Sequence, residues 1–209
     1  LVERFGLPTA LIALEGEQGR GSARSAAGWH ITEALARCGD LLLQYGGHRA
    51  AAGFALPAGA VEAFRARFLA LAAEELSPED LVPVLAAEAE VTLDELNLEV
   101  GRALARLAPH GVGNPEPTLV ARDLQVMRFA RLVGRNHLRC KLRQAVGGPV
   151  LDAIGFGLGA WLPVLSQPDP PRIDVAFVAE PNAWNGRETL QLRLKDVKLS
   201  ADPAWTPAP

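Results

Sequence analysis

The spacing of apolar residues changes near residue 118, and this change constrains the fold more than any other feature. Upstream of it, apolar side chains recur at helical intervals, as at Val61, Phe64 and Phe68. Downstream they alternate with polar ones: segment 137–143 reads HLRCKLR, which puts apolar side chains on one face and basic ones and a histidine on the other. A two-residue period is typical of strands that bury one face. We therefore predict a chain that passes from mixed helix and strand to mainly strand.

The C-terminal part contains five strand candidates, and GLGAWLPVL (157–165), between the third and the fourth, predicts a short helix. This order of elements is typical of an OB-fold, a small Greek-key β-barrel that commonly binds oligonucleotides on one sheet face. The predicted strands are 118–129, 136–143, 149–156, 172–179 and 188–199.

The N-terminal part predicts a strand, a long turn-forming segment and two helices. The apolar run 9–14 is the strand, and the Gly- and Ser-rich segment 16–28 is expected to form turns. The helices are expected at 29–38 and 58–74, and the second has Pro57 at its start.

Residues 77–80 (SPED) predict a helix cap and a domain boundary, and 84–91 predicts a further strand. Thr92 opens a capping-box pattern, so we expect a helix that stops at Pro109. The predicted fold class is α+β: an α/β lobe over residues 1–76, followed by a five-stranded OB-fold domain over 77–209 that includes the linker strand and helix. The residues that the helix after Thr92 should carry inward are Leu96, Val100, Leu104 and Leu107.

Composition places the chain among ordinary globular proteins, because 209 residues with 49% hydrophobic side chains and a net charge of -3 can bury two cores. No apolar run approaches the ~20 residues of a membrane-spanning helix, and no signal peptide opens the chain, so a cytoplasmic location is expected. Cys38 and Cys140 lie far apart and form no C-x-x-C pattern, so they predict neither a disulfide framework nor a zinc site. Leu1 opens inside an element, which suggests a fragment of a longer protein.

Basic residues gather in the C-terminal part. Segment 122–143 holds seven basic residues and one acidic residue, Asp123. A surface of this kind is suited to a polyanion.

Segment 44–54 (QYGGHRAAAGF) has two interpretations. In one, Gly46 and Gly47 form a turn, and His48 is an ordinary satisfied or exposed histidine. In the other, the glycines expose backbone N–H groups to an anion and His48 points at the same place, which would make a phosphate site.

Segment 19–25 (GRGSARS) also has two interpretations. Its glycines would let a ligand approach the backbone, Ser22 and Ser25 offer hydroxyl donors, and Arg24 offers the planar fork suited to phosphate. The alternative is a solvated connector. The segment matches neither the P-loop nor the G-x-G-x-x-G pattern, so we propose no nucleotide cofactor.

Together these segments resemble the RecJ family of single-strand-specific exonucleases, in the part that follows its catalytic DHH domain. The glycine-histidine motif alone is shared by other DHH-superfamily phosphodiesterases and by domains of alanyl-tRNA synthetases, and the OB-like domain after it points to RecJ. The matching residues are Gly21, Ser22, Arg24 and Ser25 (G-S-x-R-S), Gly46, Gly47, His48, Ala51, Ala52 and Gly53 (G-G-H-x-x-A-A-G), 111–117 (G-x-G-N-P-x-P), 153–157 (AIGFG) and 184–186 (W-N-G).

The resemblance implies a nuclease of DNA repair and recombination with two lobes. One is a DHH lobe that holds two divalent metals, Mn²⁺ or Mg²⁺, and the other is a DHH-associated lobe that binds the DNA end. This sequence contains no DHH motif, and none of its four histidines has a spacing that builds a metal site with carboxylates. We therefore expect the metals to be bound by residues before Leu1. The fragment would supply substrate positioning for removal of nucleotides from the 5' end, and it would be inactive alone.

The resemblance also implies roles for individual residues. His48 is the predicted catalytic residue, which hydrogen-bonds a phosphate oxygen at or beside the scissile bond. In the second domain, His137 or Trp184 would stack on bases, although an exposed strand face and a hairpin tip explain these residues equally well. Phe156 and Trp161 are expected in the core, and loop 110–117 is expected to be rigid structure. The remaining predicted phosphate or DNA contacts are Ser22, Arg24, Ser25, Gly46, Gly47, Arg135, Arg139 and Lys141.

The predicted partner is single-stranded DNA, and the resemblance adds a single-strand-binding protein and other repair proteins. One alternative is a non-catalytic single-strand-binding or adaptor module. The presence of His48 and Arg24 argues against this alternative. Another is a DHH-type phosphodiesterase for very short oligonucleotides or cyclic dinucleotides, which leaves the second domain unexplained.

Overall fold

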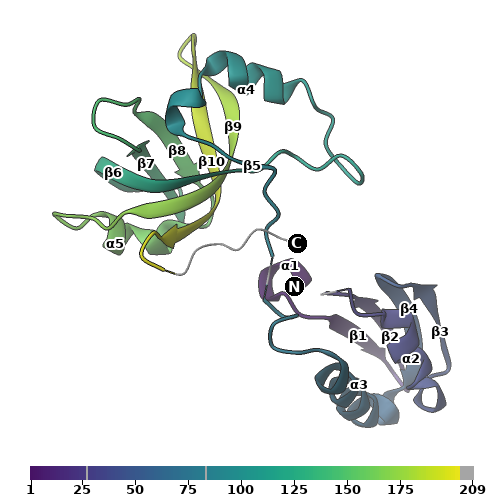
Figure 1. The fold of residues 1–209 in the computed structure, drawn as a ribbon. Helices are drawn as coiled ribbons and strands as arrows, with labels where there is room; N and C mark the ends of the chain where they lie inside the picture. The colour runs from purple at the N-terminus through teal and green to yellow at the C-terminus, as the bar shows by residue number, and fades with distance from the viewer. Residues whose placement is uncertain (27, 83, 203–209) are drawn as a thin grey trace. The chain divides into compact units, whose positions relative to one another are not determined.

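The computed structural model describes residues 1–26, 28–82 and 84–202, with their side chains except those of residues 3, 4, 128, 129 and 184. The chain forms two compact units, Leu1–Leu85 and Ala86–Pro209, and each is described here by itself. Figure 1 shows the elements of both.

The first unit is built on a four-stranded antiparallel sheet with the order β1-β2-β4-β3. Its strands are β1 (Thr9–Glu15), β2 (Gln18–Arg24), β3 (Gln44–His48) and β4 (Ala51–Pro57). Its helical elements are α1 (Val2–Phe5), α2 (Ile31–Ala36), the 3-10 turns η1 (Gly39–Leu41) and η2 (Ala58–Ala60), and α3 (Val61–Glu75).

One face of this sheet packs against α2 and α3 (Figure 1). Phe64 and Phe68 of α3 are buried, as their helical spacing predicts, and Phe64 lies 4.8 Å from the ring of Phe54 on β4. Ile31 and Leu35 of α2 complete this core.

Residues 18–24 form strand β2, so the expectation of turns throughout 16–28 is wrong. The strand lacks apolar alternation because its neighbours supply the bulk: a Cβ at Gly21 would overlap the Phe54 ring, and one at Gly19 would lie 3.0 Å from Leu56 Cδ2. Residues 44–48 are likewise a strand, and the chain turns at Arg49 and Ala50 rather than at the two glycines.

Residues 77–82 and 84–88 carry less regular structure than expected. Ser77 Oγ donates to Asp80 Oδ2 at 2.7 Å, but a turn follows rather than a helix. The strand expected at 84–91 shrinks to β5 (Ala89–Glu90), and Val84 is 85% exposed. Contacts group residues 77–85 with the first unit.

The second unit is a six-stranded sheet with the order β5-β6-β7-β8-β10-β9, and β6 also pairs with β9, so the pairings return to β6. All five expected long strands are present, and so is the short helix after the third. The strands are β6 (Leu119–Val133), β7 (His137–Arg143), β8 (Leu151–Gly155), β9 (Ile173–Trp184) and β10 (Arg187–Leu199). The helical elements are η3 (Leu93–Glu95), α4 (Leu98–Ala105), η4 (Gly159–Trp161) and α5 (Leu162–Leu165).

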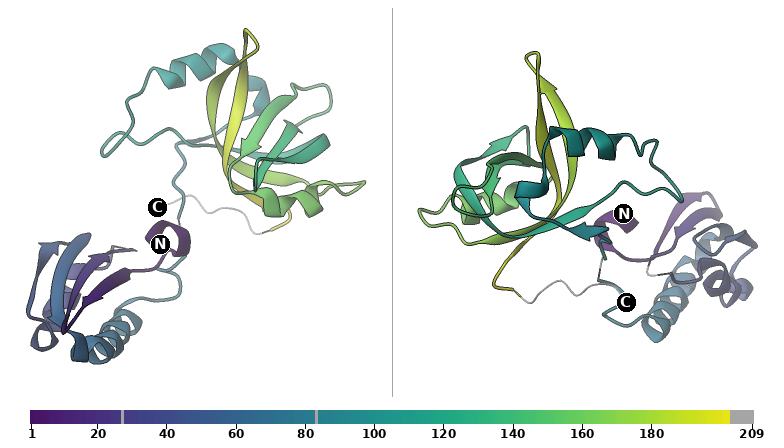
Figure 2. Two further views of the ribbon diagram at one scale, coloured as in Figure 1. Left: turned by 180° about the vertical axis from the view of Figure 1, so that it is seen from behind. Right: turned by 45° about the horizontal axis from the view of Figure 1, so that its top comes forward.

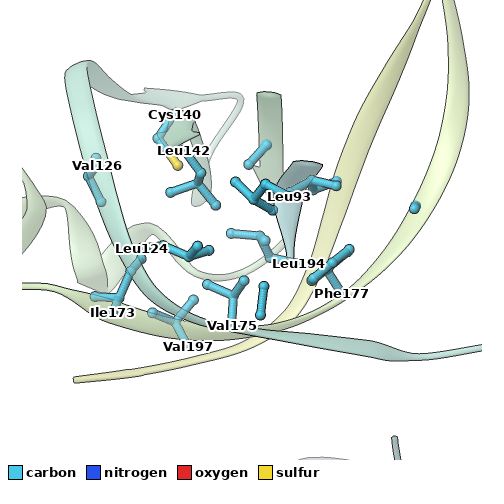
Figure 3. Packing of buried hydrophobic residues seen from close by; sticks show 14 of the residues in the cluster. Leu93, Leu124, Val126, Cys140, Leu142, Ile173, Val175, Phe177, Leu194 and Val197 are labelled. Atoms are coloured by element: carbon cyan, nitrogen blue, oxygen red, sulfur yellow. The ribbon is translucent and has the colours of Figure 1, made fainter. Parts of the chain in front are cut away.

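Figure 3 shows how the strands fill the core of this unit, with Leu124 of β6, Leu142 of β7 and Val175 of β9 pointing toward one another. Strand β7 alternates as its sequence predicts, because Leu138, Cys140 and Leu142 are all buried. Figure 2 shows the long β9–β10 hairpin, green to yellow, projecting from the rest of the sheet.

The helix predicted after Thr92 is two elements. The capping box of Thr92 and Glu95 closes only the 3-10 turn η3, and α4 starts again where the Asn97 side chain accepts a hydrogen bond from the Val100 amide at 3.0 Å. Leu107 lies beyond the end of α4 and is 52% exposed, so its expected inward position is wrong.

Two predicted core aromatics differ in outcome. Trp161 packs partly buried against the core of the second unit. Phe156, in contrast, is 56% exposed in the loop after β8, so its core assignment is wrong.

Asp174, on β9, is a buried carboxylate whose side chain is only 5% exposed. Its Oδ1 accepts hydrogen bonds from Ser200 Oγ at 2.5 Å and from the Asp123 amide at 3.0 Å. Lys198 Nζ and Arg122 Nη1 lie 3.6 and 3.7 Å from its Oδ2. Burial alone raises the pKa of Asp174, but these hydrogen bonds and charges outweigh burial and lower the pKa below its usual value.

We expect Asp174→Asn to lower the free energy of unfolding at pH 7 by about 2 kcal/mol. Because the pKa is lower in the folded state, the ionised carboxylate stabilises the fold above about pH 4 and loses this effect as the pH falls through the folded value. Urea unfolding between pH 7 and pH 3 should therefore show a smaller pH dependence in the variant. The control is Asp152→Asn, because the Asp152 side chain is more exposed (31%) than that of Asp174 and forms a partly exposed ion pair with Lys141. Equal effects of the two substitutions would show that the buried contacts of Asp174 do not stabilise the fold.

Candidate nucleic-acid interface

The sheet of the first unit buries one face and leaves polar side chains on the other. Along β2, Gly19 and Ala23 are buried, whereas Arg20, Ser22 and Arg24 are exposed. Alternate residues of a strand point to opposite faces, so the three polar residues share the face away from α2 and α3. We call this the open face.

The antiparallel register brings Arg24 and His48 onto this face together. Arg24 pairs with Ala51 on β4, and Ala51 pairs with His48 on β3. Neighbouring strands lie ~4.8 Å apart, so the Cα atoms of Arg24 and His48 are separated by roughly 10 Å with only a methyl group between them. Their side chains can therefore reach the same anion.

Ser22 occupies the next position along the open face. It pairs with Gly53, and Gly53 pairs with Gly46. Arg24 Nη1 donates to Ser22 Oγ and to the carbonyl of Ala23, both at 2.9 Å. The guanidinium and the hydroxyl are therefore held side by side.

The backbone of His48 is fixed by the start of α2. Thr32 Oγ1 donates to the His48 carbonyl at 2.9 Å, and the Ile31 amide donates to the Arg49 carbonyl at 3.0 Å. The Arg49 guanidinium donates to the Gly28 carbonyl at 3.0 and 3.1 Å. The exposed imidazole itself makes no hydrogen bond to the part of the chain that the structure describes, so it is available to a ligand.

The two glycines before His48 differ in role. Gly47 has φ 150°, and a Cβ there would lie 2.5 Å from Ala52 Cα, so only glycine fits. A Cβ at Gly46 would meet nothing within 4 Å, and it would project over the open face. Gly47 therefore serves the path of the chain, whereas Gly46 leaves space above the sheet.

Ser25 is not grouped with these residues. It follows the end of β2, and its hydroxyl donates to the Trp29 carbonyl at 2.5 Å. The structure thus uses this hydroxyl to hold the loop before α2.

Sequence reasoning missed Arg20 and Gln44, which lie on either side of Ala55 on the open face. Together with Gly46 and Gly53 they line a cavity of about 480 Å³. The signal was present: once 18–24 is recognised as a strand, alternation puts Arg20 on the face of Ser22 and Arg24.

The second unit presents a basic strand face. Arg139 and Lys141 of β7 point outward, and Arg139 pairs across the sheet with Arg131 of β6. Neither arginine has a carboxylate partner among the described residues, whereas Lys141 Nζ lies 3.5 Å from Asp152 Oδ2. Like charges opposite each other destabilise a sheet, so this pair favours a bound polyanion. Arg135 is exposed in the turn between β6 and β7.

His137 is held by its neighbours, and Phe156 is the more exposed ring. His137 Nδ1 accepts a hydrogen bond from the Gly157 amide at 3.1 Å, and the Phe156 ring lies edge-on to the imidazole at 5.1 Å. Phe156 offers more surface for stacking than the partly buried His137. The side chain of Trp184 lies outside the described residues, so its predicted stacking role stays a prediction.

Other charges of this unit serve the fold. Arg193 bonds both Glu180, at 3.0 Å, and Glu116. Burial raises the pKa of Glu116, but Arg193 and Lys195 outweigh this effect and lower it. The loop before Glu116 is held as expected, because Asn114 Nδ2 donates to two carbonyl groups at 2.9 Å.

Within residues 1–26, 28–82 and 84–202, no three His, Cys, Asp or Glu side chains come together as a metal site. None of the helices in these ranges is long and apolar enough to span a membrane.

Comparisons with known proteins match both units. The family model described as the DHHA1 domain matches residues 1–74, and that described as the RecJ OB domain matches residues 87–196. Relatives described as single-stranded-DNA-specific exonuclease RecJ include that of Bacillus subtilis, 32% identical over 96% of this chain and 25% of its own length. The relative from Dickeya dadantii is 34% identical over 92% of this chain and 34% of its own length.

Solved structures of RecJ are also similar to this chain. RecJ from Thermus thermophilus in complex with Mn²⁺ has a TM-score of 0.75 and 32% identity, covering 99% of this chain and 28% of that one. The complex with Mg²⁺ has a TM-score of 0.74 and covers 30% of that chain. The chain thus spans about a quarter to a third of the length of these relatives. With one domain match following the other along its length, the chain belongs to the RecJ family.

Proposed function

We propose that this chain binds single-stranded DNA and positions its 5' end for an exonuclease of DNA repair and recombination. The observation that carries the proposal is that Ser22, Arg24 and His48 share one exposed sheet face. Hydrolysis of the phosphodiester bond is assigned to a DHH domain outside these residues. The Thermus relatives were solved with Mg²⁺ or Mn²⁺, and because the described residues offer no three-ligand cluster, we assign either ion to that domain.

Arg24 and Ser22 are the proposed ligands of the terminal or penultimate phosphate. The guanidinium fork suits two phosphate oxygens. Ser22 Oγ accepts its hydrogen bond from Arg24, so the hydroxyl hydrogen remains available to a third oxygen. Holding this phosphate fixes which bond reaches the catalytic centre, which accounts for the removal of one nucleotide at a time.

His48 is the proposed catalytic residue of this segment. His48 lies across Ala51 from Arg24. Its imidazole N–H would donate a hydrogen bond to an oxygen of the scissile phosphate, where negative charge develops in the transition state. Gly46 keeps the backbone accessible there, and Gly47 sets the direction of His48. We assign Ser25 the supporting role of holding the loop.

In the second unit, we propose that the five long strands form the barrel of an OB-fold whose β7 face follows the DNA strand. Arg131, Arg139 and Arg135 would contact phosphates, with a smaller share from Lys141 because of its pairing with Asp152. Phe156 is the proposed stacking platform, supported by its exposure.

Three broader predictions belong to this proposal. The first domain ends near residue 76, the protein works in the cytoplasm, and a single-strand-binding protein and other repair proteins are partners.

The rival functions, an adaptor module or a phosphodiesterase for short oligonucleotides, differ in how affinity for DNA grows with strand length. An adaptor module would bind no DNA. The affinity of a short-oligonucleotide phosphodiesterase for DNA would stop rising once the strand is longer than a few nucleotides.

We expect the isolated chain to bind single-stranded DNA without cleaving it. The logarithm of its affinity should fall with the logarithm of salt concentration, with a slope of about −0.7 for each phosphate contacted. Fluorescence anisotropy over a salt series measures the slope, and gel analysis with added Mn²⁺ measures cleavage. Shortening of the strand by the pure chain would contradict the assignment of the metals.

Arg24→Ala and Arg139→Ala should weaken binding differently. Arg24→Ala should reduce the preference for a 5'-phosphate over a 5'-hydroxyl about tenfold, because a charged hydrogen bond is lost. Arg139→Ala should weaken binding to long strands and spare short ones. Arg65→Ala on α3 is the control, since it removes the same charge from an exposed position on the helix that covers the other sheet face. If both test variants lost affinity equally at every length, the division of labour would be wrong.

In the full-length enzyme, His48→Ala should lower turnover about a hundredfold while DNA affinity changes little, because its hydrogen bond strengthens in the transition state. Single-turnover kinetics and binding measured on the same protein separate the two effects. His110→Ala, at an exposed loop histidine, is the control. A loss of affinity equal to the loss of turnover would show that His48 only binds.

A further inference from the structure

The cavity on the open face extends beyond the proposed phosphate-binding residues. Successive residues on one face of a strand are ~6.7 Å apart, so Arg20 lies about 13 Å along β2 from Arg24. The row Arg20, Ala55 and Gln44 therefore forms the far end of a surface whose near end is Arg24 and His48.

The far end carries polar groups that the chain itself does not use. Arg20 and Gln44 are exposed, and the side chain of neither makes a hydrogen bond or ion pair with any of the residues described. Arginine presents donors in a plane, and the glutamine amide presents both a donor and an acceptor. Both side chains are suited to the edge of a flat polar ligand.

Two glycines, Gly46 and Gly53, form the floor of the cavity, although the packing of the fold leaves room for a side chain at both positions. A Cβ at Gly46 would meet nothing within 4 Å, and one at Gly53 would meet only the Gly21 carbonyl oxygen at 3.9 Å. Neither residue has a positive φ, so alanine would fit the folded chain at both positions. The missing side chains leave backbone against which a planar group can lie.

We infer that this cavity binds the nucleobase of the nucleotide whose phosphate is held by Ser22 and Arg24, with Arg20 and Gln44 at the base edge. The inference rests on the proposed function and adds a base-binding subsite to it. At about 480 Å³ the cavity falls in the size range of small-ligand sites. Among the described residues, Arg20 is the one charged side chain that lines it, so a neutral base suits the cavity better than a second phosphate.

The test compares two 5'-phosphorylated oligonucleotides, one normal and one abasic at the 5'-terminal nucleotide. The whole chain should bind the abasic strand about tenfold more weakly. Gly53→Ala and Gly46→Ala should bind both strands with the same low affinity, because a methyl group fills the floor. Arg20→Ala should reduce the difference in affinity between the normal and the abasic strand. Thermal unfolding of each variant confirms that the fold is retained.

Gly59→Ala is the matched control, because a Cβ there also meets nothing within 4 Å and Gly59 lies in η2, outside the cavity. It should keep the full preference for the normal strand. Arg24→Ala should reduce the preference for a 5'-phosphate and keep the preference for the normal strand over the abasic strand.

The inference is overturned if the unmodified chain binds normal and abasic strands equally while still preferring a 5'-phosphate, or if the folded Gly53→Ala and Gly46→Ala variants keep the preference. Equal affinity of the unmodified chain for 5'-phosphate and 5'-hydroxyl strands is a different result, which refutes the proposed function and this subsite with it.

Discussion

The antiparallel register of β2, β4 and β3 is the constraint on which the proposed DNA-end site depends. A slip of one residue would turn Arg24 and His48 toward the core beneath α2 and α3. Packing opposes such a slip, since Phe54 and Leu56 are buried on the helix-covered face. Hydrogen bonds from Thr32 and Ile31 at the start of α2 hold the tip of the β3–β4 hairpin. The core on one face therefore sets the chemistry on the other.

The two units present positive charge in different ways. The first has few cations at defined positions around a neutral floor, which suits the recognition of one strand end. The second opposes Arg131 and Arg139 across neighbouring strands and has an exposed Phe156 nearby, which suits contact along a chain of phosphates and bases. In the same unit, Arg193 and Asp174 are paired with side chains of the chain itself, Glu180 and Ser200 among them, and contribute to stability.

Sequence patterns predicted the strands of the second unit well, because burial of one face imposes a two-residue period that is visible in β7. They failed at β2, where the apolar bulk comes from Phe54 and Leu56 on the neighbouring strand and the sequence itself shows only Gly, Ser and Arg. Ser22, Arg24 and His48 were recognised through motifs, but their common face required the register. The exposure of Phe156 depends on where β8 ends, and boundaries of strands are poorly encoded by periodicity.

The contact between Gly21 and Phe54 limits how this sheet can change. The ring occupies the space where a side chain at position 21 would stand. The two positions share one volume, so a larger residue at 21 is compatible with the fold only alongside a smaller one at 54. A change at one of the two positions therefore requires a matching change at the other. The glycine on the strand that carries Arg24 is required by the aromatic ring on the neighbouring strand.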